Sequence, residues 1–130
     1  MVKEIISIRD LSFSYDGMPV FERINLGLMR GEVLCLFGPN GCGKTTLLDN
    51  ILGNLEPDEG AIVIDGKERG RYSRREMARR VAYVPQVHER TFPYRVLDIV
   101  VMGRTPYLSP YSSPGREDYR IAEEALEMVG

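Results

Sequence analysis

The chain has 130 residues, of which 43% are hydrophobic and 28% are charged, and its net charge at pH 7 is −2. This length suits a single domain, and the composition excludes a disordered or fibrous protein. The small net charge gives no overall electrostatic field that would indicate binding to nucleic acid or membranes. Two cysteines are too few for a disulfide scaffold, and no apolar stretch is long enough to span a membrane. Since the N-terminus has no secretion-signal pattern, we expect a soluble protein of a reducing compartment that docks, if at all, on a membrane partner.

Two half-buried strands are predicted near the N-terminus. Apolar and polar residues alternate in DLSFSYDG (residues 10–17), which ends in a turn at Asp16-Gly17. They alternate again in RINLGLMRGE (residues 23–32), which turns near Arg30-Gly31. Alternation with a period of two residues, closed by glycine turns, is typical of strands that bury one face.

The middle of the chain predicts a further strand, a helix and a short strand. The run VLCLF (residues 33–37) is continuously apolar and predicts a strand that is covered on both faces. A helix is expected over about residues 44–52, with Gly53 as its C-terminal cap. The run AIVID (residues 61–65) predicts a short strand that ends at an Asp65-Gly66 turn.

The last third of the chain predicts mostly helices. Residues 73–80 begin with a capping-box pattern and predict a short helix, and VAYVP (residues 81–85) predicts another buried strand. Residues 96–103 have a helical pattern that stops at a glycine, and a loop rich in proline, serine and tyrosine follows. From Pro114 onward, a helix is indicated by the apolar spacing of Ile121, Ala122, Ala125, Leu126 and Val129.

A glycine-rich loop lies between the apolar run 33–37 and the helix that follows it. Residues 38–45, GPNGCGKT, match the G-x-x-x-x-G-K-[ST] pattern of a phosphate-binding loop. Glycines let the backbone approach a ligand closely, so that successive N–H groups and the helix N-terminus surround an anion. Lys44 then places a charge near the β- and γ-phosphates, and Thr45 offers a hydroxyl to Mg²⁺. The predicted nucleotide-binding residues here are Gly38, Pro39, Asn40, Gly41, Cys42, Gly43, Lys44, Thr45 and Thr46.

Residues outside this loop narrow the class of protein. Tyr15 ends an early strand, Gln86 follows VAYVP directly, and the form GPNGCGKTTLL is itself distinctive. On these residues the chain resembles the ATP-binding subunit of ABC transporters. The segments VLDIVVMGRTPYL and REDYRIAEEALEMVG resemble the subgroup that serves importers of iron–siderophore, haem and cobalamin. The resemblance covers residues 7–130.

The resemblance implies an α/β fold of the P-loop NTPase type. In ABC ATPases a RecA-like core, with parallel strands, follows an N-terminal antiparallel β subdomain, and this chain is expected to end within the helical subdomain. Residues 1–130 then form the N-terminal part of one nucleotide-binding domain. Residues 1–86 hold the β subdomain and the P-loop core, and residues 87–130 begin the helical subdomain.

The resemblance also implies roles for individual residues, with ATP and Mg²⁺ as cofactors. An aromatic residue placed as Tyr15 stacks on adenine in the family; the alternative is an inward tyrosine of a strand. A glutamine placed as Gln86 contacts Mg²⁺ or the attacking water; the alternative is a polar residue that ends a strand. The predicted catalytic residues are Lys44 and Gln86, and the predicted metal contacts are Thr45 and Gln86.

The same resemblance implies partners and a location. The stretch HERTFPYRVLDIV (residues 88–100) is the candidate surface for coupling to transmembrane subunits, with a plain surface loop and helix as the alternative. The expected partners are those transmembrane subunits and a second ATP-binding subunit, a copy of the parent protein, with no nucleic acid. The expected location is cytoplasmic and peripheral, on the inner face of the cell membrane.

Four features receive simpler interpretations. His88 lacks partners at metal-ligand spacing. The basic run of residues 67–80 fits a short amphipathic helix with a solvated face better than a nucleic-acid patch. Asp65-Gly66 imitates a metal-binding motif, but a hairpin turn explains it. Cys42 is either a small residue that fits or a thiol whose alkylation blocks ATP by filling the loop.

Parts of the ABC pattern do not occur in these 130 residues. The sequence contains no Leu-Ser-Gly-Gly-Gln signature, no apolar run that ends in Asp-Glu and no switch histidine. We therefore expect the chain to bind ATP and to hydrolyse it only at a trace rate, because phosphoryl transfer depends on positioned charges. Two alternatives stay open: a non-catalytic nucleotide-binding fragment that acts as a regulator or dimer partner, and a soluble P-loop phosphotransferase.

Overall fold

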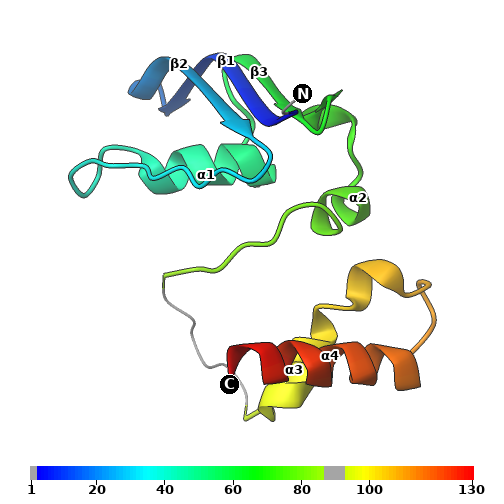
Figure 1. Cartoon of the computed structure of the whole chain (residues 1–130). Coiled ribbons are helices and arrows are strands. Elements are labelled where there is room, and N and C mark those ends of the chain that lie inside the picture. Colours follow the sequence, from blue (N-terminus) through cyan, green and yellow to red (C-terminus); the bar gives the residue numbers. More distant parts are fainter. Residues whose placement is uncertain (1–2, 87–92) are drawn as a thin grey trace. The chain divides into compact units, whose positions relative to one another are not determined.

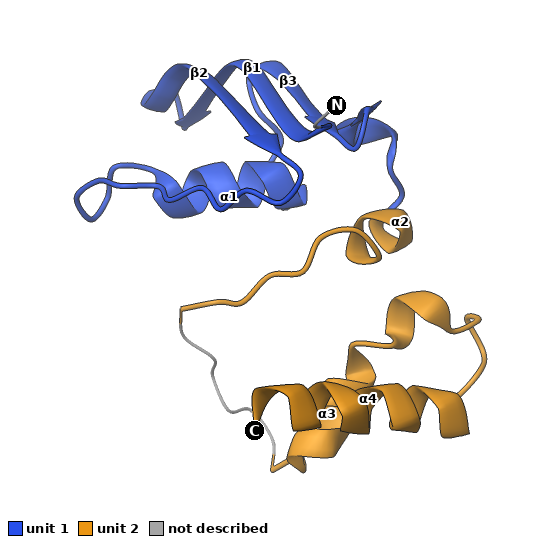
Figure 2. Cartoon of the chain, in the orientation of Figure 1, with its two compact units in different colours: residues 1–73 blue, residues 74–130 orange. Residues whose placement is uncertain are grey.

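The computed structural model describes residues 3–86 and 93–130. The chain divides into two compact units, residues 1–73 and residues 74–130, here called the N-terminal unit and the C-terminal unit (Figure 2). The predicted boundary between residues 86 and 87 adjoins a stretch outside the described residues and stays a prediction.

The N-terminal unit is built on a four-stranded antiparallel sheet in the order β2-β1-β3-β4 (Figure 1). The strands are β1 (Glu4–Tyr15), β2 (Met18–Met29), β3 (Glu59–Ile64) and β4 (Lys67–Glu68). Both residues of each Asp-Gly turn have positive φ: 48° and 79° at Asp16-Gly17, and 48° and 81° at Asp65-Gly66. Such turns match the twist of antiparallel strands, so both predicted Asp-Gly turns are confirmed.

The pairing of β1 with β2 contains a β-bulge near the hairpin. Phe13 is opposite Phe21, and Ser14 is opposite Pro19. One step along β1 therefore corresponds to two steps along β2, and Val20 is the extra residue. A bulge bends its strand and redirects a side chain. Here the redirected side chain is that of Val20, on the face of β2 toward the glycine-rich loop.

Helix α1 (Lys44–Leu52) covers one face of the sheet (Figure 1). Leu47, Asn50 and Ile51 of this helix are buried. The helix ends at Gly53, whose φ of 84° is the left-handed conformation that glycine adopts most easily, so the predicted helix and cap are both confirmed. The sheet contributes the remaining buried apolar side chains of this unit, which are Ile8, Leu11, Phe13, Ile62 and Ile64.

Two predicted strands are wrong. Residues 33–37 and 81–85 are not strands, and Val33, Phe37 and Val84 expose at least nine-tenths of their surface. Apolar runs become strands only where a neighbouring strand completes the backbone hydrogen bonds. Within residues 3–86 and 93–130 no strand pairs with either run, so the expected parallel core strands are not formed there.

The C-terminal unit contains the helices α2 (Arg74–Ala78), α3 (Val96–Met102) and α4 (Arg116–Val129) and a 3₁₀ turn at Thr105–Tyr107. Helices α3 and α4 pack together, and their buried side chains are Val101 and Ala122. The helix predicted over residues 96–103 is confirmed, with Gly103 at its C-terminal end, and so is the helix predicted after Pro114.

Arginine side chains link α2 and α4 to the 3₁₀ turn. The Nε atoms of Arg75 and Arg79 donate to the Pro106 carbonyl at 2.7 and 2.8 Å. The Arg104 guanidinium lies 4.3 Å from the centre of the Tyr107 ring and donates to Asp118 at 3.0 Å. The pKa of Asp118 lies below its ordinary value because its carboxylate accepts from the Gly115 N–H and from Arg104.

Candidate functional site

The glycine-rich loop leads directly into α1. Gly41 and Gly43 have φ values of 84° and 98°, which residues with a β-carbon rarely adopt. Helix α1 starts without a side-chain cap, and its first turn has no acidic residue. The first N–H groups of a helix have no partner within the helix, so this uncapped start is suited to an anion.

Lys44 closes the loop into a ring. Its Nζ atom donates to the carbonyls of Gly38 and Pro39 at 2.7 and 2.8 Å, and a weaker contact of 3.7 Å joins it to the Cys42 sulfur. An ammonium group has three donors, and a sulfur acceptor is weak. A phosphate oxygen is therefore able to replace the Cys42 contact while both carbonyl contacts persist.

Threonine side chains follow the lysine at the start of the helix. Thr45 is exposed, so its hydroxyl is accessible to a metal ion that accompanies phosphates. Thr46 is half-buried, and its carbonyl accepts a hydrogen bond from Asn50. The residues of this loop thus fit a magnesium-bound phosphate chain in charge and donors.

Tyr15 presents an aromatic ring at the hairpin tip of the same unit. The ring is 48% exposed and stands edge-on to Phe13, with the centroids 4.8 Å apart and an interplanar angle of 86°. Stacking on a base needs an accessible ring held in one orientation, and this geometry supplies both. The predicted role of Tyr15 is compatible with its position and stays a prediction.

Gln86 is exposed and belongs to the C-terminal unit. It is the last residue before the stretch that the structure does not describe, and its role stays a prediction. His88 and the first part of the candidate coupling surface lie outside the described residues. Cys42 is an exposed thiol, and a β-carbon on Gly38 would meet its sulfur at 2.6 Å.

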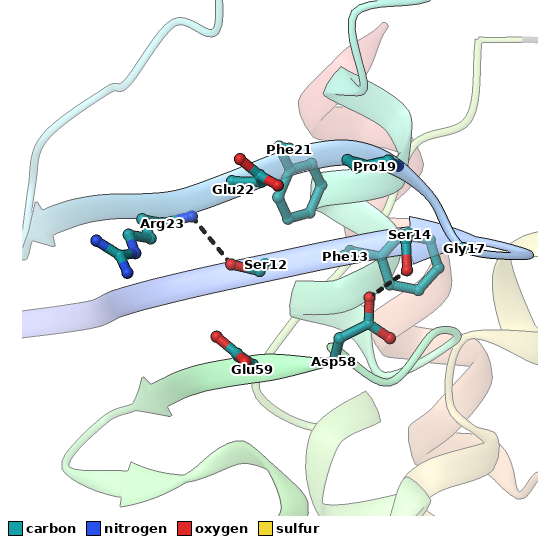
Figure 3. A pocket seen from close by; sticks show the side chains of 10 residues that line it. All are labelled: Ser12, Phe13, Ser14, Gly17, Pro19, Phe21, Glu22, Arg23, Asp58 and Glu59. Carbon is teal, nitrogen blue, oxygen red and sulfur yellow. Dashed lines mark hydrogen bonds between the residues drawn. The ribbon is translucent and has the colours of Figure 1, made fainter.

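A cavity of about 490 Å³ lies beside the β1–β2 hairpin (Figure 3). Its lining includes the carboxylates of Glu22, Asp58 and Glu59, and no residue of the loop 38–45. Ser14 donates to Asp58 across it at 2.6 Å. Arg23 also lines it, so the lining carries three carboxylates and one cation, and this acidic excess disfavours a phosphate.

The structure brings two residues to the loop that the sequence did not single out. Val20 and Phe21 of β2 lie against Gly43. No pattern in the sequence indicates this contact, because a bulge cannot be recognised from alternation. The basic run, by contrast, makes structural contacts: Arg69 pairs with Glu56, and Arg75 binds backbone carbonyls.

The glycine-rich loop that leads into α1 has the sequence pattern of a P-loop NTPase. The ABC transporter family profile matches residues 21–130, and the chain belongs to this family. The expected fold class is thereby confirmed.

Several import proteins are similar over nearly the whole chain. The hemin import ATP-binding protein HmuV of Thermobifida fusca is 40% identical over 122 residues, 94% of this chain and 42% of that protein. The iron(3+)-hydroxamate import protein FhuC of Bacillus subtilis is 32% identical, and the match covers 96% of this chain and 46% of FhuC. The molybdate import protein MolC of Haemophilus influenzae is 35% identical, and the match covers 98% of this chain and 46% of MolC. The chain thus spans less than half the length of the curated relatives it matches.

A solved structure agrees with this assignment. An ABC transporter in an inward-facing conformation, assigned to the metal-chelate type, superposes with a TM-score of 0.77 at 34% identity. The match covers 97% of this chain and 44% of the other. The relatives include hemin and iron-hydroxamate import proteins, as the predicted subgroup requires, and the match covers less than half of each.

Among the residues that the structure describes, no helix combines the length and the hydrophobicity needed to cross a membrane.

Proposed function

We propose that this chain is the N-terminal part of the ATP-binding subunit of an ABC importer, which couples binding and hydrolysis of MgATP to uptake of an iron–siderophore, haem or cobalamin-type solute. The observation that carries the proposal is the closed ring of Lys44 with Gly38 and Pro39 at the uncapped start of α1. The relatives support the importer assignment, since they are import proteins for hemin, iron hydroxamate and molybdate.

Each residue of the site has a distinct task in this proposal. ATP, when bound, would supply the phosphoryl group, and Mg²⁺ would supply positive charge beside it. The loop N–H groups and the Lys44 ammonium hold the phosphates, and the Thr45 hydroxyl holds the metal ion. Tyr15 stacks on adenine, which is worth about 1–3 kcal/mol. By the family resemblance, the role proposed for Gln86 is contact with Mg²⁺ or the attacking water.

Hydrolysis requires more than these residues. A carboxylate must polarise water, and a signature segment of a second subunit must close over the γ-phosphate. The apolar run that ends in Asp-Glu, which would supply the carboxylate, and the Leu-Ser-Gly-Gly-Gln signature are both missing from the 130 residues. Loss of such groups commonly lowers rates by about 10² to 10⁴. We predict binding of MgATP with turnover far below about 1 s⁻¹, the low end of ordinary enzymes.

The proposed partners are transmembrane subunits and a second copy of the ATP-binding subunit, at the cytoplasmic face of the membrane. The relatives are import ATP-binding proteins, which supports this arrangement. Residues 88–100 remain the candidate coupling surface.

Calorimetry with MgATP tests the proposal. Lys44→Ala is expected to weaken binding by roughly tenfold to 100-fold, since a hydrogen bond to a charged group is worth about 1.5–3 kcal/mol. Lys3→Ala is the matched control, because Lys3 pairs with Asp65 on the surface of the same unit. No binding by the folded parent chain, or equal binding by Lys44→Ala, refutes the proposal. Phosphorylation of a small acceptor would instead favour the phosphotransferase alternative.

A further inference from the structure

The β-bulge in β2 turns two side chains toward the nucleotide loop. A β-carbon placed on Gly43 would lie 2.7 Å from Cγ1 of Val20 and 3.3 Å from Cδ1 of Phe21. A side chain at position 43 therefore has no room, and the loop backbone rests directly on these two residues. Because Val20 is the extra residue of the bulge, it lies on the same side as Phe21 instead of alternating with it.

Phe21 also contacts the aromatic side chains that lead to the hairpin tip. The rings of Phe21 and Phe13 are 6.2 Å apart between centroids, and Phe13 meets Tyr15 at 4.8 Å. Figure 3 shows the Phe13 and Phe21 rings on the two paired strands. Phe13 is buried. Contacts therefore run without a break from the Tyr15 ring, through two phenylalanines, to the backbone of Gly43.

We propose that Val20 and Phe21 are positioning residues that set the spacing between the Tyr15 ring and the phosphate-binding loop. The proposal rests on the proposed function, in which Tyr15 stacks on the base and the loop holds the phosphates. A nucleotide has a limited length, so both contacts form together only when ring and loop are correctly spaced. A misplacement of about 1 Å lowers the efficiency of a positioned site considerably.

This role predicts a specific loss when Val20 is shortened. Val20→Ala removes the methyl groups that support Gly43, and the loop settles closer to the strand. The loop still holds a phosphate chain, but the base no longer reaches Tyr15 at the right distance. Binding of MgATP weakens, whereas binding of magnesium tripolyphosphate, which has no base, does not change.

Calorimetry with MgATP and with magnesium tripolyphosphate measures both effects on the whole chain. Tyr15→Ala is expected to weaken MgATP binding by roughly fivefold to 150-fold, the loss of base stacking. Val20→Ala is expected to weaken it by roughly threefold to tenfold. Both variants keep tripolyphosphate binding within about twofold of the parent chain. Val20→Ile, which retains a branched side chain, binds both ligands like the parent chain.

The double variant separates positioning from simple structural support. If Val20 acts through Tyr15, the double variant Tyr15→Ala with Val20→Ala binds MgATP as Tyr15→Ala does, because no stacking remains to be lost. Effects that multiply in the double variant, or an equal loss for both ligands in Val20→Ala, overturn the inference.

A matched control and the parent chain complete the test. Val63→Ala removes the same atoms from a half-buried position of β3 and leaves the ratio of the two affinities unchanged. If the parent chain binds neither ligand, the proposed function fails. If the parent chain binds both and the two mutations act independently, only the positioning role fails.

Discussion

The two units of this chain are stabilised in different ways. The N-terminal unit buries apolar side chains of β1 and β3 against α1, among them Leu11, Ile62 and Leu47. In the C-terminal unit the buried apolar side chains of the described residues are Met77, Val101 and Ala122. Much of what connects its helices is instead arginine bound to carbonyls, carboxylates and a tyrosine ring.

This difference explains why the glycine-rich loop lies where it does. A loop that must hold its N–H groups in fixed directions needs a rigid support, and close packing of apolar side chains provides one. The loop rests on β2 and opens α1, both in the unit with the larger apolar core. Four mutations and one change of pH test this comparison, and they follow from the largest expected effect to the smallest.

The largest effect is expected in the core of the sheet. Ile62 of β3 is 3% exposed, so Ile62→Ala should lower the free energy of unfolding by about 2–5 kcal/mol through lost burial and a cavity. Ile99→Ala in α3 is the matched control, since Ile99 is 46% exposed and its replacement should change stability by less than about 0.5 kcal/mol. Urea denaturation followed by circular dichroism measures both. Equal losses would show that burial of Ile62 in the sheet does not stabilise the N-terminal unit.

A smaller effect of opposite sign is expected at Asn50. This side chain is fully buried, its amide donates to the Thr46 carbonyl at 2.8 Å, and its oxygen has no partner within the described part of the chain. Asn50→Thr keeps a donor for that carbonyl and removes the amide oxygen, so the free energy of unfolding should rise by about 1 kcal/mol. The same replacement at the exposed Asn54 is the control. A clear loss of stability in Asn50→Thr would mean that the oxygen has a partner.

Acid should act on the C-terminal unit before the N-terminal core. The pKa of Asp98 is lowered by Arg95, that of Glu117 by Arg120, and that of Asp118 by the Gly115 N–H and Arg104. A lowered folded-state pKa means that the stabilisation is complete above the ordinary value near pH 4 and is lost as the pH falls below it. Hydrogen exchange of amides in α3 and α4 between pH 6 and pH 3 measures this.

The variant Asp118→Asn refines the acid experiment. The amide oxygen of asparagine still accepts from Gly115, but it carries no charge for Arg104. Exchange in α4 should therefore be faster at pH 6 and less dependent on pH than in the parent chain. If exchange in α4 depended on pH identically in the variant and the parent chain, Asp118 would not be the source of the acid sensitivity.

The smallest effect is expected at Phe37. This ring is entirely exposed although it belongs to one of the most apolar runs of the chain. Phe37→Ala should change the free energy of unfolding by less than about 0.5 kcal/mol, in contrast to Ile62→Ala. A loss above about 1 kcal/mol in urea denaturation would show that residues 33–37 pack against something.

Much of the fold and of the candidate site could be predicted from the sequence. Local chemistry specifies the Asp-Gly turns, the helix that ends at Gly53 and the loop around Lys44, because each depends on the conformations that a few neighbouring residues allow. The candidate site residues 38–46 and Tyr15 were predicted from their spacing and from the family resemblance. Their positions in one unit are compatible with those roles.

The sequence alone determined what each segment is able to become, because turn conformations, helix caps and a phosphate-binding loop depend on local backbone preferences. Only the tertiary structure decided which apolar runs pair: residues 59–64 have β1 as a neighbour and form a strand, whereas residues 33–37 and 81–85 have none among the described residues. It also decided that Val20 leaves the alternation of β2 and reaches Gly43, since a bulge arises from the register between two strands.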